Sequence, residues 1–153
     1  MAESNGVLVA ATMKGIIRST DNGENWALVD SEGIVAYDVK QIKGGFAAIT
    51  SSSASNTRRL RTSYDGGKTW QPIDAGLEDD VWRTWNDRPA VQAYMTIIMH
   101  VGENFYCSHP DGIFRSSDKG RTWKLLLPSV QKKAFRLFVS GNVIYAIRSK
   151  GGC

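Results

Sequence analysis

Three aspartates are the first candidates for chemistry, because each stands beside a serine, a glycine and a tryptophan at fixed spacing. The stretch "SYDGGKTW" (63–70) has near-copies in "STDNGENW" (19–26) and "SSDKGRTW" (116–123), and all fit S-x-D-x-G-x-x-W. A single copy would suggest an active-site loop with a catalytic carboxylate. A site is normally built once and a scaffold repeatedly, so the repetition favours a structural role. The box residues are Ser19, Asp21, Gly23, Trp26, Ser63, Asp65, Gly67, Trp70, Ser116, Asp118, Gly120 and Trp123.

A second candidate set combines arginine and tryptophan in two long irregular stretches, 51–59 and 75–92. Arginine suits the recognition of carboxylate or phosphate groups, and tryptophan suits a sugar or a partner surface. The alternative is a pair of solvated loops whose tryptophans pack inside the fold. The turn-like "HPDG" adds a histidine to the set. The candidate ligand-binding residues are Arg58, Arg59, Trp82, Arg83, Trp85, Asp87, Arg88 and His109.

Other reactive residue types give no site. His100 and His109 have no Cys, Asp or Glu at the spacing of metal ligands, so neither a metal nor a cofactor is predicted. The adjacent acids at 78–80 are typical of a solvated acidic turn, whereas glycoside hydrolysis needs a separated carboxyl pair. Cys107 stands in an apolar run and is expected to be a small buried residue. The sequence therefore predicts no catalytic residue.

The spacing of the boxes indicates the elements that position them. Asp21, Asp65 and Asp118 are separated by 44 positions (21 to 65) and 53 positions (65 to 118), and such periods are typical of propeller or solenoid arrays. Each period holds four short β-rich stretches divided by Gly, Asn and Asp, which is the content of a β-propeller blade. "AVQAYMTIIMHV" alone suggests a helix, but its place in the repeat indicates a strand. We predict one all-β domain over 1–153 made of four-stranded antiparallel blades, with units at roughly 5–31, 34–75, 92–128 and 134–151.

The predicted position of the box, between the third and fourth strands of each blade, explains its residues. Asp at the start of a turn accepts hydrogen bonds from backbone N–H groups further along. The glycine takes positive φ without steric cost. The tryptophan then begins the next strand and packs over the hairpin.

The same antiparallel order predicts where function lies. The loops at 51–59 and 75–92 fall at the end of the strands opposite the boxes, and loops on a rigid scaffold are where function concentrates. "NGVLVAATMKG" near the start and "GNVIYAIRSKGG" near the end both correspond to a second strand. The chain therefore holds about three blades, half of a six- or seven-bladed ring. Open blade edges predict self-association, or a missing half that closes the ring.

The repeated box resembles the Asp-box, or BNR, repeat of the sialidase-like propellers, and the resemblance covers most of the chain. It implies a propeller, but no single activity, since sialidases, sortilin-type receptors, xyloglucan-degrading hydrolases and a photosystem assembly factor all carry such boxes. It also implies boxes on the face away from an active site, and a secreted or periplasmic location. The sialidase F/Y-R-I-P signature is missing here, and no Tyr–Glu pair can be assigned. Arg18 and Arg115 precede their boxes as part of the repeat.

Composition narrows the classes of partner. The hydrophobic share of 42% and charged share of 22% are ordinary for a globular domain. A net charge of +4 without long basic runs suits an anionic ligand and argues against nucleic acid. No apolar run approaches the roughly 18 residues of a membrane span, so membrane insertion is not expected. "MAESNG" shows no signal peptide, which leaves the compartment open.

These observations favour a non-catalytic binding or scaffold propeller that recognises a glycan or a protein. One alternative is part of a sialidase-like glycoside hydrolase of the exo-sialidase type. Another is an assembly factor that docks on a large complex. The first predicts binding without turnover, and the second predicts hydrolysis of a sialoside.

Overall fold

The computed structural model describes residues 1–30, 34–52, 58–75, 77, 98–109, 111–130, 134–141 and 143–148. The regular elements in these ranges are all β-strands, which confirms the predicted all-β fold class. Within the same ranges, no helix is long and apolar enough to cross a membrane. The chain divides into two compact units, which contain the described residues up to Asp74 and those from Ala75 onward.

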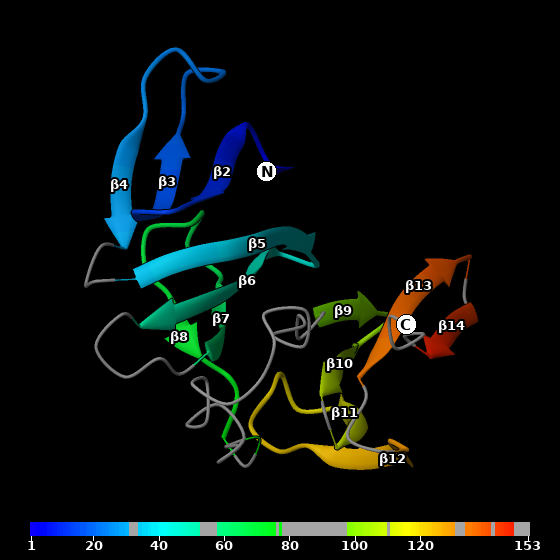
Figure 1. The fold of residues 1–153 in the computed structure, drawn as a ribbon. Helices are drawn as coiled ribbons and strands as arrows, with labels where there is room; N and C mark the ends of the chain where they lie inside the picture. Colours follow the sequence, from blue (N-terminus) through cyan, green and yellow to red (C-terminus); the bar gives the residue numbers. More distant parts are fainter. Residues whose placement is uncertain are drawn as a thin grey trace. The chain divides into compact units, whose positions relative to one another are not determined.

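The first unit contains two four-stranded antiparallel sheets, in which strands adjacent in sequence are adjacent in space (Figure 1). The first sheet consists of β1 (Ala2–Ser4), β2 (Val7–Thr12), β3 (Gly15–Ser19) and β4 (Ala27–Asp30). The second sheet consists of β5 (Ile34–Ile42), β6 (Gly45–Ser52), β7 (Arg58–Ser63) and β8 (Gln71–Pro72).

The second unit repeats this order. The third sheet consists of β9 (Ile98–Val101), β10 (Asn104–His109), β11 (Gly112–Ser116) and β12 (Lys124–Pro128). The fourth sheet has two described strands, β13 (Phe135–Ser140) and β14 (Val143–Arg148). Each four-stranded sheet carries one box between its third and fourth strands, as the sequence predicts.

The sequence pattern did not indicate the short strand β1. It pairs with β2 through a two-residue turn at Asn5 and Gly6, where φ is 52° and 75°. Positive φ at both turn residues defines the type I′ hairpin, for which Asn-Gly is the preferred sequence. Glu3 Oε1 accepts a hydrogen bond from the Gly6 N–H at 2.9 Å and closes the turn.

Alternation along the strands gives each sheet two faces. We call the face that carries Val9 on the first sheet, and the face that corresponds to it by ladder register on the other sheets, the leading face, and the opposite one the trailing face. On the first sheet, Val9 and Ile16 belong to the leading face. They form a buried core with Phe46, Ala48 and Trp70, which belong to the trailing face of the second sheet.

Two polar contacts join the same pair of sheets. Arg18 Nε on β3 donates to the carbonyl oxygen of Gly66 in the second box at 2.6 Å. Arg61 Nη1 on β7 lies 2.8 Å from Asp30 Oδ2 at the end of β4. The two sheets are therefore tied at the box end by one arginine and nearer the opposite end by another.

Gly67 is a second point of close approach between the second box and the first sheet. Its φ is 79°, a conformation that side chains disfavour. A Cβ at this position would lie 2.9 Å from Val9 Cγ2, which is too short for a real contact. Gly66 also has positive φ, at 71°, but a Cβ there would have no neighbour within 3.8 Å. Glycine at 67 is therefore required by packing as well as by the turn.

The second unit uses the same packing between its two sheets. Tyr106 and Ile113 on the leading face of the third sheet pack against Phe135, Leu137 and Ile144 on the trailing face of the fourth. Ser108 Oγ also donates to the Phe135 carbonyl oxygen at 2.5 Å.

Truncation of Trp70 to alanine is expected to lower the free energy of unfolding by about 3–5 kcal/mol, because this ring is only 7% exposed. Trp26 is the matched control. Its Nε1 donates to the Gly23 carbonyl at 2.9 Å, as Trp70 Nε1 does to Gly67 at 3.2 Å, but Trp26 is 38% exposed. At about 25 cal/mol per Å² over an aromatic side chain, Trp26→Ala should cost about 1–2 kcal/mol less. Urea unfolding of both variants measures the difference, and equal losses would contradict the packing described here.

Candidate binding site

The box of the second sheet forms a closed network around Ser63 and Asp65. Ser63 Oγ donates to Asp65 Oδ1 at 2.8 Å and accepts the Gly67 N–H at 2.9 Å. Asp65 Oδ1 also accepts the backbone N–H groups of Lys68 and Thr69, both at 3.0 Å, and its Oδ2 accepts the Thr69 hydroxyl at 2.6 Å. The carboxylate is thus satisfied by its own loop.

The other two boxes repeat this network. Ser19 Oγ donates to Asp21 Oδ1 at 2.6 Å, and Asn25 supplies the backbone donor at 2.9 Å. Asp118 accepts the Thr122 N–H at 2.9 Å and the Thr122 hydroxyl at 2.6 Å. The box glycine donates its N–H to the serine Oγ in all three copies, at 3.0, 2.9 and 2.8 Å.

These hydrogen bonds stabilise the ionised carboxylates. Donation from the Ser19 hydroxyl, with further donation from Asn25, lowers the pKa of Asp21 to about 2. Donation from the Thr122 hydroxyl lowers the pKa of Asp118 to about 2, and the equivalent threonine lowers that of Asp65. A general acid or base works best with a pKa near the operating pH, so the networks fit a structural turn better than proton transfer at neutral pH.

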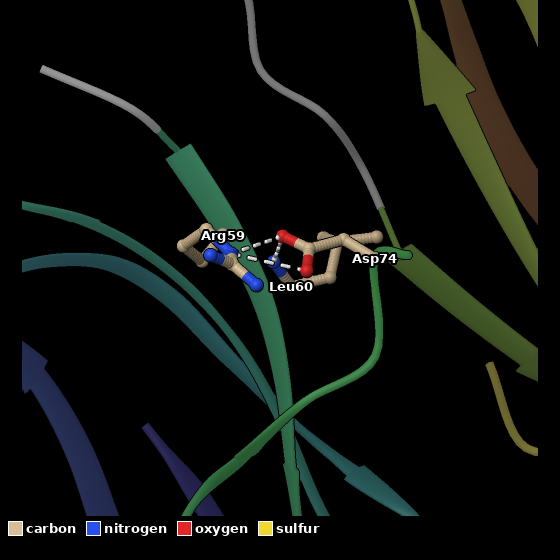
Figure 2. Close-up of polar contacts among 3 residues, drawn as sticks. All are labelled: Arg59, Leu60 and Asp74. Atoms are coloured by element: carbon tan, nitrogen blue, oxygen red, sulfur yellow. Dashed lines mark hydrogen bonds and ion pairs between the residues drawn. The ribbon is translucent and has the colours of Figure 1, made fainter. Parts of the chain in front are cut away.

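The polar cluster at the opposite end of the second sheet centres on Arg59 and Asp74 (Figure 2). Arg59 is the second residue of β7, the strand that ends at the box, and Asp74 follows β8; we call this end of the sheet the far rim. Arg59 Nε donates to Asp74 Oδ2 at 2.8 Å and to Oδ1 at 3.0 Å, and the Leu60 N–H donates to Oδ2 at 3.1 Å. The Asp74 side chain is 11% exposed, whereas that of Arg59 is 42% exposed. The carboxylate therefore holds the guanidinium at the surface.

Comparison of the sheets shows why an arginine fits here. The ladder register makes Arg59 the counterpart of Gly15 in the first sheet. A Cβ at Gly15 would lie 1.9 Å from the Asp30 carbonyl oxygen, and the equivalent glycine of β11 is crowded in the same way, at 2.1 Å. In the second sheet β8 is only two residues long, and the Asp74 side chain takes over the contact with β7. The shorter outer strand leaves room for a long cationic side chain.

Two further polar side chains, those of Thr50 and Arg61, lie on the same face of the second sheet as Arg59. Thr50 is directly opposite Arg59 in the ladder, and Arg61 is two residues further along β7. Within the described part of the chain, Thr50 Oγ1 and Arg61 Nε are buried without a hydrogen-bond partner. The terminal nitrogens of Arg59 likewise have no partner among the described residues. This face of the second sheet therefore carries, near the far rim, hydrogen-bonding atoms that have no partner among the described residues.

The structure places His109 at the end of β10, where it is buried. Its Nδ1 accepts the Asp111 N–H at 3.1 Å, and its ring meets Phe114 edge-on at 5.5 Å. Cys107 on the same strand is also buried. No three His, Cys, Asp or Glu side chains in the described ranges form a group able to hold a metal ion.

The predicted loop residues are only partly visible. Arg59 is fully described, and Arg58 lies in β7 with its side chain outside the described set. Sequence reasoning missed Asp74, although a signal exists: an aspartate stands four residues after the box tryptophan in both "WALVD" and "WQPID". The residues that lie outside the described ranges are Trp82, Arg83, Trp85, Asp87 and Arg88.

Comparisons with known proteins agree with the fold and with the repeated box. The family model described as BNR/Asp-box repeat matches residues 61–72. Among solved structures, YCF48 from Cyanidioschyzon merolae superposes with a TM-score of 0.54 at 14% sequence identity, covering 95% of this chain and 46% of that chain. This chain thus spans less than half the length of that neighbour, and at this identity the likeness concerns the fold alone. A comparison with curated protein sequences finds no match.

The lowered pKa values predict a loss of stability in acid. A carboxyl with a folded pKa of about 2 and an ordinary value of 3.8 stabilises the fold above pH 4, and this contribution disappears as the pH falls through 2. Asp118→Asn should therefore be less stable than wild type at pH 6, and the difference should shrink towards pH 2. Urea midpoints measured across this range provide the test.

Asp38→Asn controls for the loss of one negative charge, since the Asp38 side chain is 41% exposed and its Oδ2 lies 3.6 Å from Lys40 Nζ. A stability difference between Asp118→Asn and wild type that stays constant from pH 6 to pH 2 would contradict the role assigned to the box carboxylate.

Proposed function

We propose that this chain, a partial β-propeller that carries Asp-box repeats, is a non-catalytic binding module whose far rim recognises a carboxylate group on a glycan or a protein partner. The observation that carries the proposal is the half-exposed guanidinium of Arg59. Asp74 engages its Nε, and the terminal nitrogens have no partner among the described residues. In the sequence, the stretch 51–59 ends at Arg59 and the stretch 75–92 begins directly after Asp74.

The chemistry of the guanidinium supports a carboxylate ligand. Arginine donates from a planar fork that matches the two oxygens of a carboxylate, and such charge-assisted pairs are stronger than neutral hydrogen bonds. The ion pair with Asp74 fixes the side chain before a ligand arrives, which lowers the entropy cost of binding. The net charge of +4 favours the approach of an anionic partner.

The carboxylates of the described residues support binding without turnover. A glycoside hydrolase needs an acid whose pKa is raised, together with a second carboxylate at a fixed separation. The box carboxylates have lowered pKa values, and Asp74 is engaged by Arg59 and Leu60. The alternative of a sialidase-like hydrolase is therefore treated as an outcome of the test.

The test compares acidic and neutral probes. Sialyllactose and a glutamate-rich peptide carry carboxylates, whereas lactose and the glutamine version of the peptide do not. We expect at least one acidic probe to shift the amide resonances of Arg59, Leu60 and Asp74, and the matched neutral probe to leave them unchanged. Arg59→Lys keeps the charge but removes the fork, and loss of a charged hydrogen bond should weaken binding about 10- to 100-fold.

Arg121→Lys is the matched control, because this arginine is exposed in the third box, at the other end of its sheet. It should bind as the wild type does. If Arg59→Lys folds normally and binds unchanged, or if neither acidic probe binds, the proposal is wrong. Release of free sialic acid from sialyllactose would favour the hydrolase instead.

A further inference from the structure

The fourth sheet exposes an apolar face. Its trailing face packs on the third sheet, but the opposite side presents Phe138, Val143, Tyr145 and Ile147, which are 49–56% exposed. Single exposed apolar residues are common, but four on one face of a two-stranded sheet form a patch of the kind that marks an interaction site.

The repeat shows what such a face does elsewhere in the chain. The pair Ser4 and Val7 flanks the β1–β2 turn as Ser140 and Val143 flank the β13–β14 turn. The register therefore makes Tyr145 the counterpart of Val9. Val9 is 0% exposed because the trailing face of the second sheet covers it, whereas Tyr145 is 51% exposed. The leading face of the fourth sheet thus has the position of a face that another sheet covers.

The first sheet has the complementary surface. Its trailing face carries Leu8, Ile17, Trp26 and Leu28, and the last two are among the exposed large apolar residues. Trp26 is the counterpart of Trp70, which the leading face of the first sheet covers in the interface described above. Within its own unit, and among the described residues, each of these two faces is therefore exposed.

The side-chain sizes at these two faces are matched. In the interface between the first and second sheets, a small leading residue, Val9, packs with a large trailing residue, Phe46. Phe46 and Leu8 occupy the same position, since each pairs with the serine of its own box. A contact between Tyr145 and Leu8 would therefore reverse the sizes, with the large residue on the leading face and the smaller one on the trailing face. Protein cores tolerate such exchanges when the total side-chain volume is conserved.

We propose that the leading face of the fourth sheet binds the trailing face of the first sheet of a second copy of this chain. The contact continues the packing seen between the first and second sheets and is independent of the ligand proposed for the far rim. Because the two faces are different, the association is head to tail, and it produces a closed ring if the rotation closes or an open chain of copies if it does not.

Sedimentation velocity over micromolar to millimolar concentrations tests the association. We expect reversible association that Tyr145→Glu and Trp26→Glu each weaken at least about tenfold, because aromatic residues at the centre of an interface dominate its affinity. Val130→Glu is the matched control, since Val130 is 53% exposed and lies outside both faces. It should associate as the wild type does. A monomer at every concentration, or association that survives both charged variants, would overturn the proposal.

Cross-linking tests the head-to-tail geometry. Copies with Tyr145→Cys and copies with Trp26→Cys, both in a Cys153→Ser background, are mixed and treated with a short bismaleimide. We expect products only when both kinds of copy are present. Efficient linking of Tyr145→Cys copies to one another would show that the faces pair with themselves, and would overturn the assignment of the first sheet as the partner.

Discussion

The approach of Gly67 to Val9 is the constraint on which the first unit depends. The second box must turn the chain and also allow the first sheet to pack closely against it. Gly67 meets both needs, because it adopts positive φ and because a Cβ at this position would be too close to Val9. The surrounding interactions hold this approach in place. Ser63 and Asp65 fix the loop from within, and Arg18 anchors it to the first sheet through a box carbonyl. A motif that resembles a reactive loop thus acts as a packing element.

The two ends of the second sheet differ in how their polar groups are satisfied. At the box end, the polar groups are satisfied locally, and the aspartates are fully ionised at neutral pH. At the far rim of the second sheet, the short outer strand frees Arg59 from the crowding that requires glycine at the counterpart position, Gly15. The short β8 is a departure from the repeat, and it leaves room at this edge of the sheet for the ion pair of Arg59 with Asp74.

The sequence predicts the fold class well, because the box recurs at blade-length spacing and turn chemistry has strict residue requirements. It predicts less about particular strands. β1 is too short and polar to show alternation, although Asn5-Gly6 signals its hairpin. The sequence also does not predict the exposed position of Trp26, because the three boxes have the same tryptophan and only the neighbouring sheet decides its burial. Likewise, the pairing of Arg59 with Asp74 depends on how early β8 ends, which no local pattern specifies.

A double-mutant cycle between Val9→Ala and Gly67→Ala tests the central claim most directly. Both single variants should be destabilised, the first by a lost core contact and the second by strain and overlap. Val9→Ala removes the methyl group that a new Cβ at position 67 would meet. The double variant should therefore lose about 1 kcal/mol less unfolding free energy than the two single variants lose in sum. Gly66→Ala combined with Val9→Ala should be additive, because a Cβ at Gly66 has no close neighbour. Additive losses for the Val9 and Gly67 pair, within about 0.5 kcal/mol, would contradict the account.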